Sequence, residues 1–142
     1  MSDDWALQSF QALREEHFVG LCRKLNLSAE TLQVDRGFAI VSAAAGNVRV
    51  FFEHDRGLCL FGLGAFADSK ALCSVEEVAE RFPRIRLVPE GRQRLTLEEQ
   101  RSFVEVRWPA LQVMFSPEHL SETRKWHEAV VRQTTKGFSR GS

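Results

Sequence analysis

Apolar positions in the first part of the chain recur with the period of an α-helix. Steps of three and four residues place them on one helical face: Leu7, Phe10, Leu13 or Arg14, Phe18, Leu21 and Leu25. This pattern predicts a helix from about Asp4 to Leu25. Acidic residues at its start and basic residues at its end suit the helix dipole, and Asn26 is expected to end it.

The middle of the chain shows the short apolar runs typical of β-strands. We expect strands over Phe38 to Ala44, Asn47 to Glu53 and Leu58 to Phe66, with Leu32 to Val34 as a further strand. The polar segment His54–Gly57 predicts an exposed hairpin turn. These three or four strands are expected to form an antiparallel meander. Phe51 interrupts the alternation of apolar and polar residues, which indicates burial on both faces of the sheet.

The second half carries signals for the start of helices. Ser74 to Glu77 and Thr96 to Glu99 both match a capping box, in which two side chains pair with the free N–H groups of a helix start. The first of these helices should end near Phe82, because Pro83 disfavours helix in the residue before it. The second has an inner stripe that includes Leu97, Phe103, Val104 and Trp108.

Proline residues set the expected limits of the remaining helices. Pro109 lacks a backbone donor and should kink or break the helix that begins after Thr96. Ser116-Pro117-Glu118 matches an N-cap followed by proline at the first helical position. The last helix is expected to run to about Gln133, so that residues 1–134 form a single globular domain and residues 135–142 a flexible tail.

These elements together predict an α+β fold. It consists of an N-terminal helix, an antiparallel meander of about four to five strands, and C-terminal helices packed beside or across the sheet. One further edge strand is expected around Ile85 to Val88, where apolar residues alternate with Arg84 and Arg86. Charged residues on such a strand discourage pairing with other sheets.

Composition and charge exclude several classes of protein. The 142 residues include 19 basic and 19 acidic side chains, which gives a net charge of zero. Nucleic-acid binding normally needs a basic excess, so no nucleic-acid partner is expected. The longest uncharged stretches are too short to cross a membrane, and the acidic N-terminus does not resemble an export signal. We therefore expect a cytoplasmic protein without a membrane partner.

The side chains that carry most enzyme chemistry are scattered. Cys22, Cys59 and Cys73 are odd in number and form no Cys-x-x-Cys pair, which argues against disulfides. The four histidines are too widely spaced to predict a metal site. Cys59 could meet His54 across the predicted hairpin, but its apolar surroundings raise a thiol pKa. We expect no metal, no cofactor and no enzymatic activity.

A local excess of arginine follows the first capping box. Residues 81–94 hold five arginines against one acid, Glu90. A guanidinium group binds carboxylates and phosphates through a rigid fork, so this stretch could dock an acidic partner. The same pattern also fits an edge strand with a charged outer face, and an edge strand can itself receive a partner. Both interpretations remain open.

Part of the second half resembles a known group of proteins. The residues are Leu97-Glu98-Glu99-Gln100-Arg101-x-Phe103, then Trp108-Pro109-Ala110-Leu111-Gln112, then Phe115-Ser116-Pro117-Glu118. They are similar to the C-terminal region of small bacterial immunity proteins associated with polymorphic and secreted toxins. The order of a helix, a strand meander and further helices is similar too. The resemblance implies a cytosolic protein that binds and blocks one cognate toxin.

Three functions remain for the structure to address. The first is an immunity protein that neutralises a secreted toxin by stoichiometric binding. The second is a non-catalytic adaptor or chaperone subunit, and the third is a small-molecule-binding domain or enzyme. Self-association into a homodimer is also kept open. The candidate contacts for a protein partner are Trp5, His54, Asp55, Arg56, Arg84, Arg86, Arg92, Arg94 and Trp108.

Overall fold

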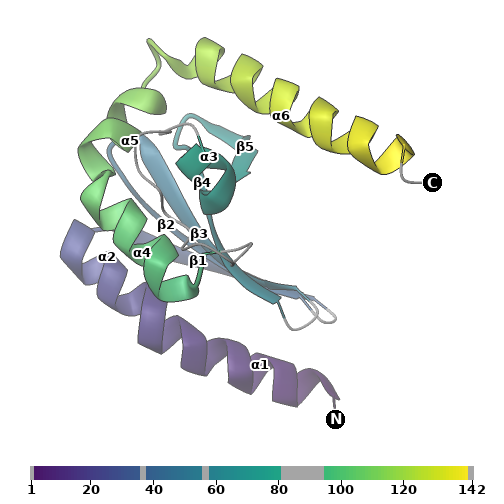
Figure 1. Ribbon diagram of the computed structural model, residues 1–142. Coiled ribbons are helices and arrows are strands. Elements are labelled where there is room, and N and C mark those ends of the chain that lie inside the picture. The colour runs from purple at the N-terminus through teal and green to yellow at the C-terminus, as the bar shows by residue number, and fades with distance from the viewer. Residues whose placement is uncertain (1, 36–37, 56–57, 81–94, 141–142) are drawn as a thin grey trace.

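A five-stranded antiparallel sheet forms the centre of the molecule. The computed structural model describes residues 2–35, 38–55, 58–80 and 95–140 (Figure 1). The strands pair in chain order, so that each lies beside the one before it. They are β1 (Ser28–Asp35), β2 (Phe38–Ala45), β3 (Val48–Asp55), β4 (Leu58–Ala65) and β5 (Asp68–Ser74). The predicted α+β fold with an antiparallel meander is confirmed.

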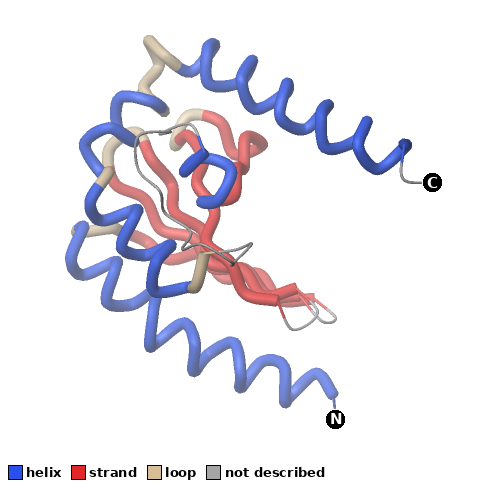
Figure 2. Tube along the Cα trace, in the orientation of Figure 1, coloured by secondary structure: helices blue, strands red, loops and turns tan. Residues whose placement is uncertain are grey.

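Helices precede and follow the sheet. Helices α1, α2, α4 and α5 lie along one side of the strands, whereas α6 extends across the top of the view (Figures 1 and 2). The helical elements are α1 (Ser2–Leu13), η1 (Arg14–Phe18), α2 (Val19–Leu25), α3 (Val75–Glu80), α4 (Leu97–Val106), α5 (Trp108–Met114) and α6 (Leu120–Arg140).

The N-terminal helix contains one π-helical turn, η1, between α1 and α2. In a regular α-helix, the eight residues from Phe10 to Phe18 rotate by about 800°, which leaves the two side chains about 80° apart. A π turn accommodates one extra residue, removes about 100° of rotation and so returns both rings to one face. Both rings stack on Phe52 of β3, at centroid distances of 5.8 and 6.2 Å.

The end of this helical segment agrees with the sequence. Asn26 has the left-handed conformation (φ 57°), which stops the helix after Leu25. The N–H of Leu27 donates to the carbonyl of Cys22 at 2.9 Å, which satisfies one of the last free carbonyls. Of the predicted stripe, Phe10, Phe18 and Leu21 are fully buried.

The two faces of the sheet have different roles. On β3, Val48, Val50, Phe52 and His54 are buried, and the residues between them point to the opposite face. The buried face, called the inner face here, joins apolar residues of the helices in one core. Its largest fully buried side chains are Phe10, Phe18, Phe52, Phe61, Phe115, Leu21, Leu63 and Leu111. The opposite face is called the outer face.

Strand β5 has little signal of its own in the sequence. It begins with Asp68 and lacks a clear apolar alternation, and its pairing with β4 defines it. The predicted arginine-rich edge strand lies in residues 81–94, outside the described residues. Beyond the end of β5, the buried N–H of Phe61 on β4 donates to the side-chain carbonyl of Gln100 at 2.9 Å.

Both predicted capping boxes are present. The N–H of Glu77 donates to the Ser74 hydroxyl at 3.1 Å, and the N–H of Ser74 donates to the Glu77 carboxylate at 2.9 Å. Thr96 and Glu99 form the same pair of hydrogen bonds, at 3.1 and 2.9 Å. The helices α3 and α4 therefore begin where the sequence predicts.

Pro109 separates two helices, which is one of the two expected outcomes, because α4 ends at Val106 and α5 has its proline in the first turn. The C-terminal helices differ from the expectation in two other places. The expected N-cap at Ser116 is wrong: its hydroxyl donates to the Val113 carbonyl at 2.7 Å, at the end of α5, and α6 begins at Leu120. The expected end near Gln133 is also wrong. The helix continues to Arg140, since no proline interrupts this stretch.

Candidate functional site

The outer face of the sheet carries apolar side chains that do not belong to the core. Phe38, Ile40, Phe51 and Leu60 are half-buried on this face, while Leu58 is 47% exposed. Their neighbours in strand register include the small residues Ser42, Ala44, Gly62 and Gly64. An apolar sheet face of this kind is a candidate for protein contact.

Arg49 stands at one end of the outer face. Its guanidinium lies over the ring of Phe66, 5.4 Å from the ring centroid, and Phe66 is 58% exposed. The Nε atom of Arg49 is buried and has no hydrogen-bond partner. A buried donor without an acceptor costs free energy.

Glu53 stands toward the other end of the same face. Its strand neighbours are Ile40 on β2 and Leu60 on β4, both apolar. Burial raises the pKa of the Glu53 carboxyl above its usual 4.5, and the charge of Asp55 raises it further. No described side chain forms an ion pair with Glu53 that would offset this burial.

A second apolar surface lies where α4 meets α5. We call it the corner surface and define it by Val106, Pro109 and Val113, together with the half-buried Trp108. Val106 is 71% exposed and Val113 is 55% exposed. Backbone hydrogen bonds continue across the junction, from Arg107 to the Phe103 carbonyl and from Leu111 to the Arg107 carbonyl, both at 2.9 Å. Val106 is the last residue of α4, and Pro109 and Val113 lie in the first and last turns of α5.

The corner surface rests on a turn of the sheet. The side-chain oxygen of Gln112 accepts from the Asn47 N–H at 2.8 Å, and its amide nitrogen donates to the Ala45 carbonyl at 3.0 Å. The Asn47 side chain donates in return to the Gln112 carbonyl at 3.1 Å. These three hydrogen bonds fix α5 against the β2–β3 turn, which gives the corner surface a rigid support.

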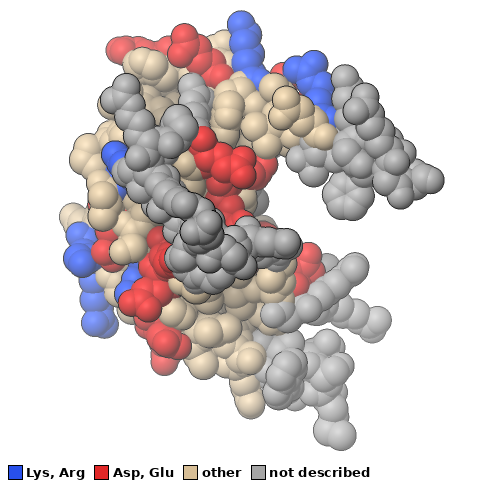
Figure 3. Space-filling view, viewed as in Figure 1, with Lys and Arg blue, Asp and Glu red and all other residues tan. Residues whose placement is uncertain are grey.

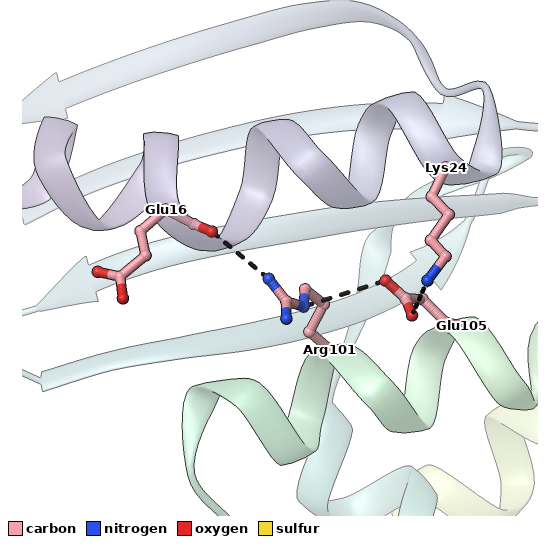
Figure 4. Close-up of polar contacts among 4 residues, drawn as sticks. All are labelled: Glu16, Lys24, Arg101 and Glu105. Carbon is pink, nitrogen blue, oxygen red and sulfur yellow. Dashed lines mark hydrogen bonds and ion pairs between the residues drawn. The ribbon is translucent and has the colours of Figure 1, made fainter.

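Polar contacts also join α4 to the N-terminal helical segment (Figure 4). Lys24 donates to the Glu105 carboxylate at 3.1 Å, and Arg101 Nε lies 4.0 Å from the other oxygen of Glu105. Arg101 Nη1 also donates to the main-chain oxygen of Glu16 in the π turn at 3.4 Å. Exposed ion pairs contribute little free energy, but together they orient α4.

Acidic side chains gather over α3, in the hollow below α6 (Figure 3). Two of them have structural contacts. Glu76 accepts from the Leu95 N–H at 3.3 Å, and Glu77 caps its helix and lies 3.5 Å from His127 of α6. These contacts connect α3 to the start of α4 and to α6.

The two members of the possible cysteine–histidine pair lie on adjacent strands, but the thiol is a poor nucleophile. His54 and Cys59 lie opposite each other on β3 and β4. Burial raises the pKa of the Cys59 thiol, and burial together with the Glu77 charge raises that of Cys73 to about 12. Both thiols are therefore protonated at neutral pH and are weak nucleophiles. Within the described ranges, no three His, Cys, Asp or Glu side chains are grouped so as to hold a metal ion.

The residues predicted to contact a partner differ in their location and exposure. His54 was expected in an exposed turn, and this is wrong: it lies within β3, is 5% exposed and packs at 6.4 Å from the Phe10 ring. The strand simply extends two residues further than expected, to the exposed Asp55. Trp108 is half-buried against the core. Trp5 lies in α1, and Arg56, Arg84, Arg86, Arg92 and Arg94 lie outside the described residues.

Sequence reasoning missed the main residues of both surfaces. The outer-face residues Arg49 and Glu53 alternate with buried ones, and this alternation predicts a strand but not a binding surface. Val106 and Val113 lie beside predicted core positions, and their exposure depends on how α4 and α5 are packed. The sequence signal that could have found them is the three-and-four spacing of Val106, Pro109 and Val113.

Comparisons with known proteins give no relative, because no family model, no curated protein and no solved structure matches the chain. In the part of the chain that the structure describes, no helix has the length and apolar character needed to span a membrane.

Proposed function

We propose that this chain is a cytosolic immunity-type protein. It binds one secreted bacterial toxin in a one-to-one complex and blocks it without catalysing a reaction. The partner is a protein, and no cofactor or metal takes part. The observation that carries the proposal is the corner surface, where Val106 and Val113 expose large apolar side chains on a fixed support.

Rigidity and exposure together suit the corner surface to stoichiometric binding of a protein. A stoichiometric inhibitor needs apolar anchors that are already ordered before binding, since ordering them on binding lowers affinity. The Gln112 hydrogen bonds and the Glu105 contacts hold α5 and α4 in place. Part of the segment that resembles immunity proteins, Trp108 to Gln112, supplies this corner.

The proposal is tested with the protein encoded by the neighbouring reading frame. Cells that produce that protein should stop growing, and co-production of this chain should restore growth. Replacing Val106 and Val113 together by glutamate should abolish the rescue while the circular dichroism spectrum stays unchanged. Val131→Glu, at a 46% exposed valine on α6, is the matched control and should still rescue.

Two results would contradict the proposal. The first is that the chain forms no complex with the neighbouring product, and that cells lacking the gene compete with their parent strain as well as before. The second is that the corner variant rescues growth as well as the unmodified chain does.

A further inference from the structure

Two charged residues of the outer face, Arg49 and Glu53, stand symmetrically about Phe51 along β3. Phe51 lies at the centre, Arg49 lies two residues before it and Glu53 two residues after it, all on the same face. Two residues of a strand span about 7 Å, so the Cα atoms of Arg49 and Glu53 lie at about equal distances from that of Phe51. A second β3 that crosses this face in the antiparallel direction places a glutamate opposite each arginine.

The sizes of the neighbouring side chains follow the same symmetry. Arg49 lies between Ala44 and Gly64 in strand register, so its neighbours project little from the sheet. Glu53 lies between Ile40 and Leu60, whose large side chains project farther from the sheet. The antiparallel crossing that pairs the charges also places the large residues of one copy over the small residues of the other.

Exposed apolar residues extend this match to both ends of the face. Phe66 lies beside the arginine end and is 58% exposed. Leu58 lies at the opposite end, paired with Asp55, and is 47% exposed. In the antiparallel arrangement the Phe66 ring of one copy covers the Leu58 end of the other, so that both lose contact with water.

In the single chain, neither Arg49 nor Glu53 forms an ion pair with a described residue. The buried Nε of Arg49 lacks an acceptor. Burial between apolar neighbours raises the pKa of Glu53, and no described side chain pairs with it. A carboxylate opposite the arginine pairs with its guanidinium, and a guanidinium opposite the glutamate favours its ionised form.

We propose that the outer face is the interface of a twofold-symmetric homodimer, in which Arg49 of each copy pairs with the partner's Glu53 and the symmetry axis passes beside Phe51. Packed sheets lie about 10 Å apart and cross at about 30°. At about 7 Å from the axis, this angle displaces facing residues by about 3–4 Å, which the long Arg and Glu side chains can span. An isologous contact of this kind is closed and does not lead to fibres.

The first experiment measures the mass of the purified full chain by size-exclusion chromatography with light scattering over a wide concentration range. We expect twice the 16.2 kDa of the single chain at high concentration. Arg49→Glu places like charges together at two symmetric sites, and so does Glu53→Arg. Each single variant should weaken dimerisation at least tenfold. Lys24→Glu, which removes an exposed pair on α2, should leave the dimer unchanged.

The second experiment exchanges the charges of Arg49 and Glu53, which face each other across the proposed twofold axis. The double variant Arg49→Glu with Glu53→Arg exchanges the two charges and should restore dimerisation to within a few-fold of the unmodified chain. This readout separates an interface from a folding defect, because only a direct pairing across the twofold axis is rescued by the exchange. Phe66→Ala, at an exposed site, should weaken the dimer without affecting the fold.

Three outcomes would overturn the proposal. They are a single chain at all concentrations, a dimer that survives both charge reversals, and a double variant no better than the single ones. The Val106→Glu/Val113→Glu variant of the corner surface should still dimerise, so this test and the test of the proposed function can fail separately.

Discussion

Gly46 controls the turn between β2 and β3 through its backbone alone. Its φ of 59° lies in the left-handed region, and a Cβ at this position would clash with the side-chain amide of Gln112. The same amide forms two hydrogen bonds to the turn, so its displacement would also loosen α5. The absence of a side chain at Gly46 therefore leaves room for Gln112, which connects the turn of the sheet to the corner surface.

Gly46→Ala should lower the free energy of unfolding by about 2 kcal/mol, from the left-handed strain and the displaced Gln112. Urea denaturation followed by circular dichroism measures the change. Gly20→Ala is the matched control: no atom lies within 4 Å of its added Cβ, and its helical position should gain up to about 1 kcal/mol. Equal effects of the two substitutions would refute this account of the turn.

Cys73 should make the protein less stable in alkali. Its folded pKa of about 12 lies above the ordinary value of 9.0, because burial and the Glu77 charge disfavour the thiolate. Above pH 9 the unfolded thiol loses its proton and the folded one keeps it, so the folded state binds more protons. The stability that is present below pH 9 is then lost as the pH rises toward 12.

The measurement is the free energy of unfolding between pH 8 and about pH 11, for the unmodified chain and for Cys73→Ala. The variant should start lower, because a buried side chain is shortened, but should fall less steeply with pH. Parallel curves would show that the thiol does not contribute to the pH dependence. In the native protein at pH 8, Cys73 should also resist alkylation.

At the scale of elements, Gln100 connects a helix to an unprotected strand edge. It is 4% exposed, and its side chain accepts from the Phe61 N–H and donates to the Leu95 carbonyl at 3.1 Å. Strand β5 ends before it can pair with this part of β4, so the glutamine supplies the missing partner. Without it, two buried backbone groups would lack hydrogen bonds.

Gln100→Leu preserves the size of the side chain but removes both hydrogen bonds. We expect a loss of about 2–4 kcal/mol, which is the cost of leaving one buried donor and one buried acceptor unsatisfied. Thermal or urea unfolding measures it. Ser102→Leu, at an exposed position on the same helix, should change stability by less than about 0.5 kcal/mol. A loss below about 1 kcal/mol in Gln100→Leu would show that water replaces the glutamine.

At the scale of the whole molecule, the sequence was informative where the determinants are local. Apolar spacing predicted the N-terminal helix, and the Ser74 and Thr96 capping boxes marked two helix starts to the residue. The meander followed from short apolar runs separated by turns. Strand β5 was missed because its pairing with β4, rather than its own residues, makes it a strand. The start of α6 was misplaced because Ser116 bonds back to α5.

The candidate surfaces were harder to predict because exposure is a non-local property. Val106 and Val113 look like core residues until the packing of α4 and α5 turns them outward. His54 looked like a turn residue, yet the strand continues past it and buries it beside Phe10. The positions of Arg49 and Glu53 among their neighbours depend on the register of three strands, which no local pattern encodes.

The π turn makes the position of α1 depend on a residue count. Deleting Glu15 should convert the segment into regular α-helix with the two rings seven residues apart, which keeps both on one face. Inserting one alanine after Glu15 should instead rotate α1 by about 100° and remove the Phe10 ring from Phe52, at a cost of about 3 kcal/mol in unfolding free energy. Glu15→Ala preserves the count and should change stability little. An insertion that is as stable as the substitution would contradict this explanation.

The same count gives a rule for recognising related chains. An insertion in this segment increases the spacing of the two rings from seven to eight residues, and the π turn keeps both rings on one face. A relative without the π turn should place its two aromatic residues seven positions apart, where this chain has eight. Length variation near residue 15 therefore carries more structural information than the identity of the charged side chains there.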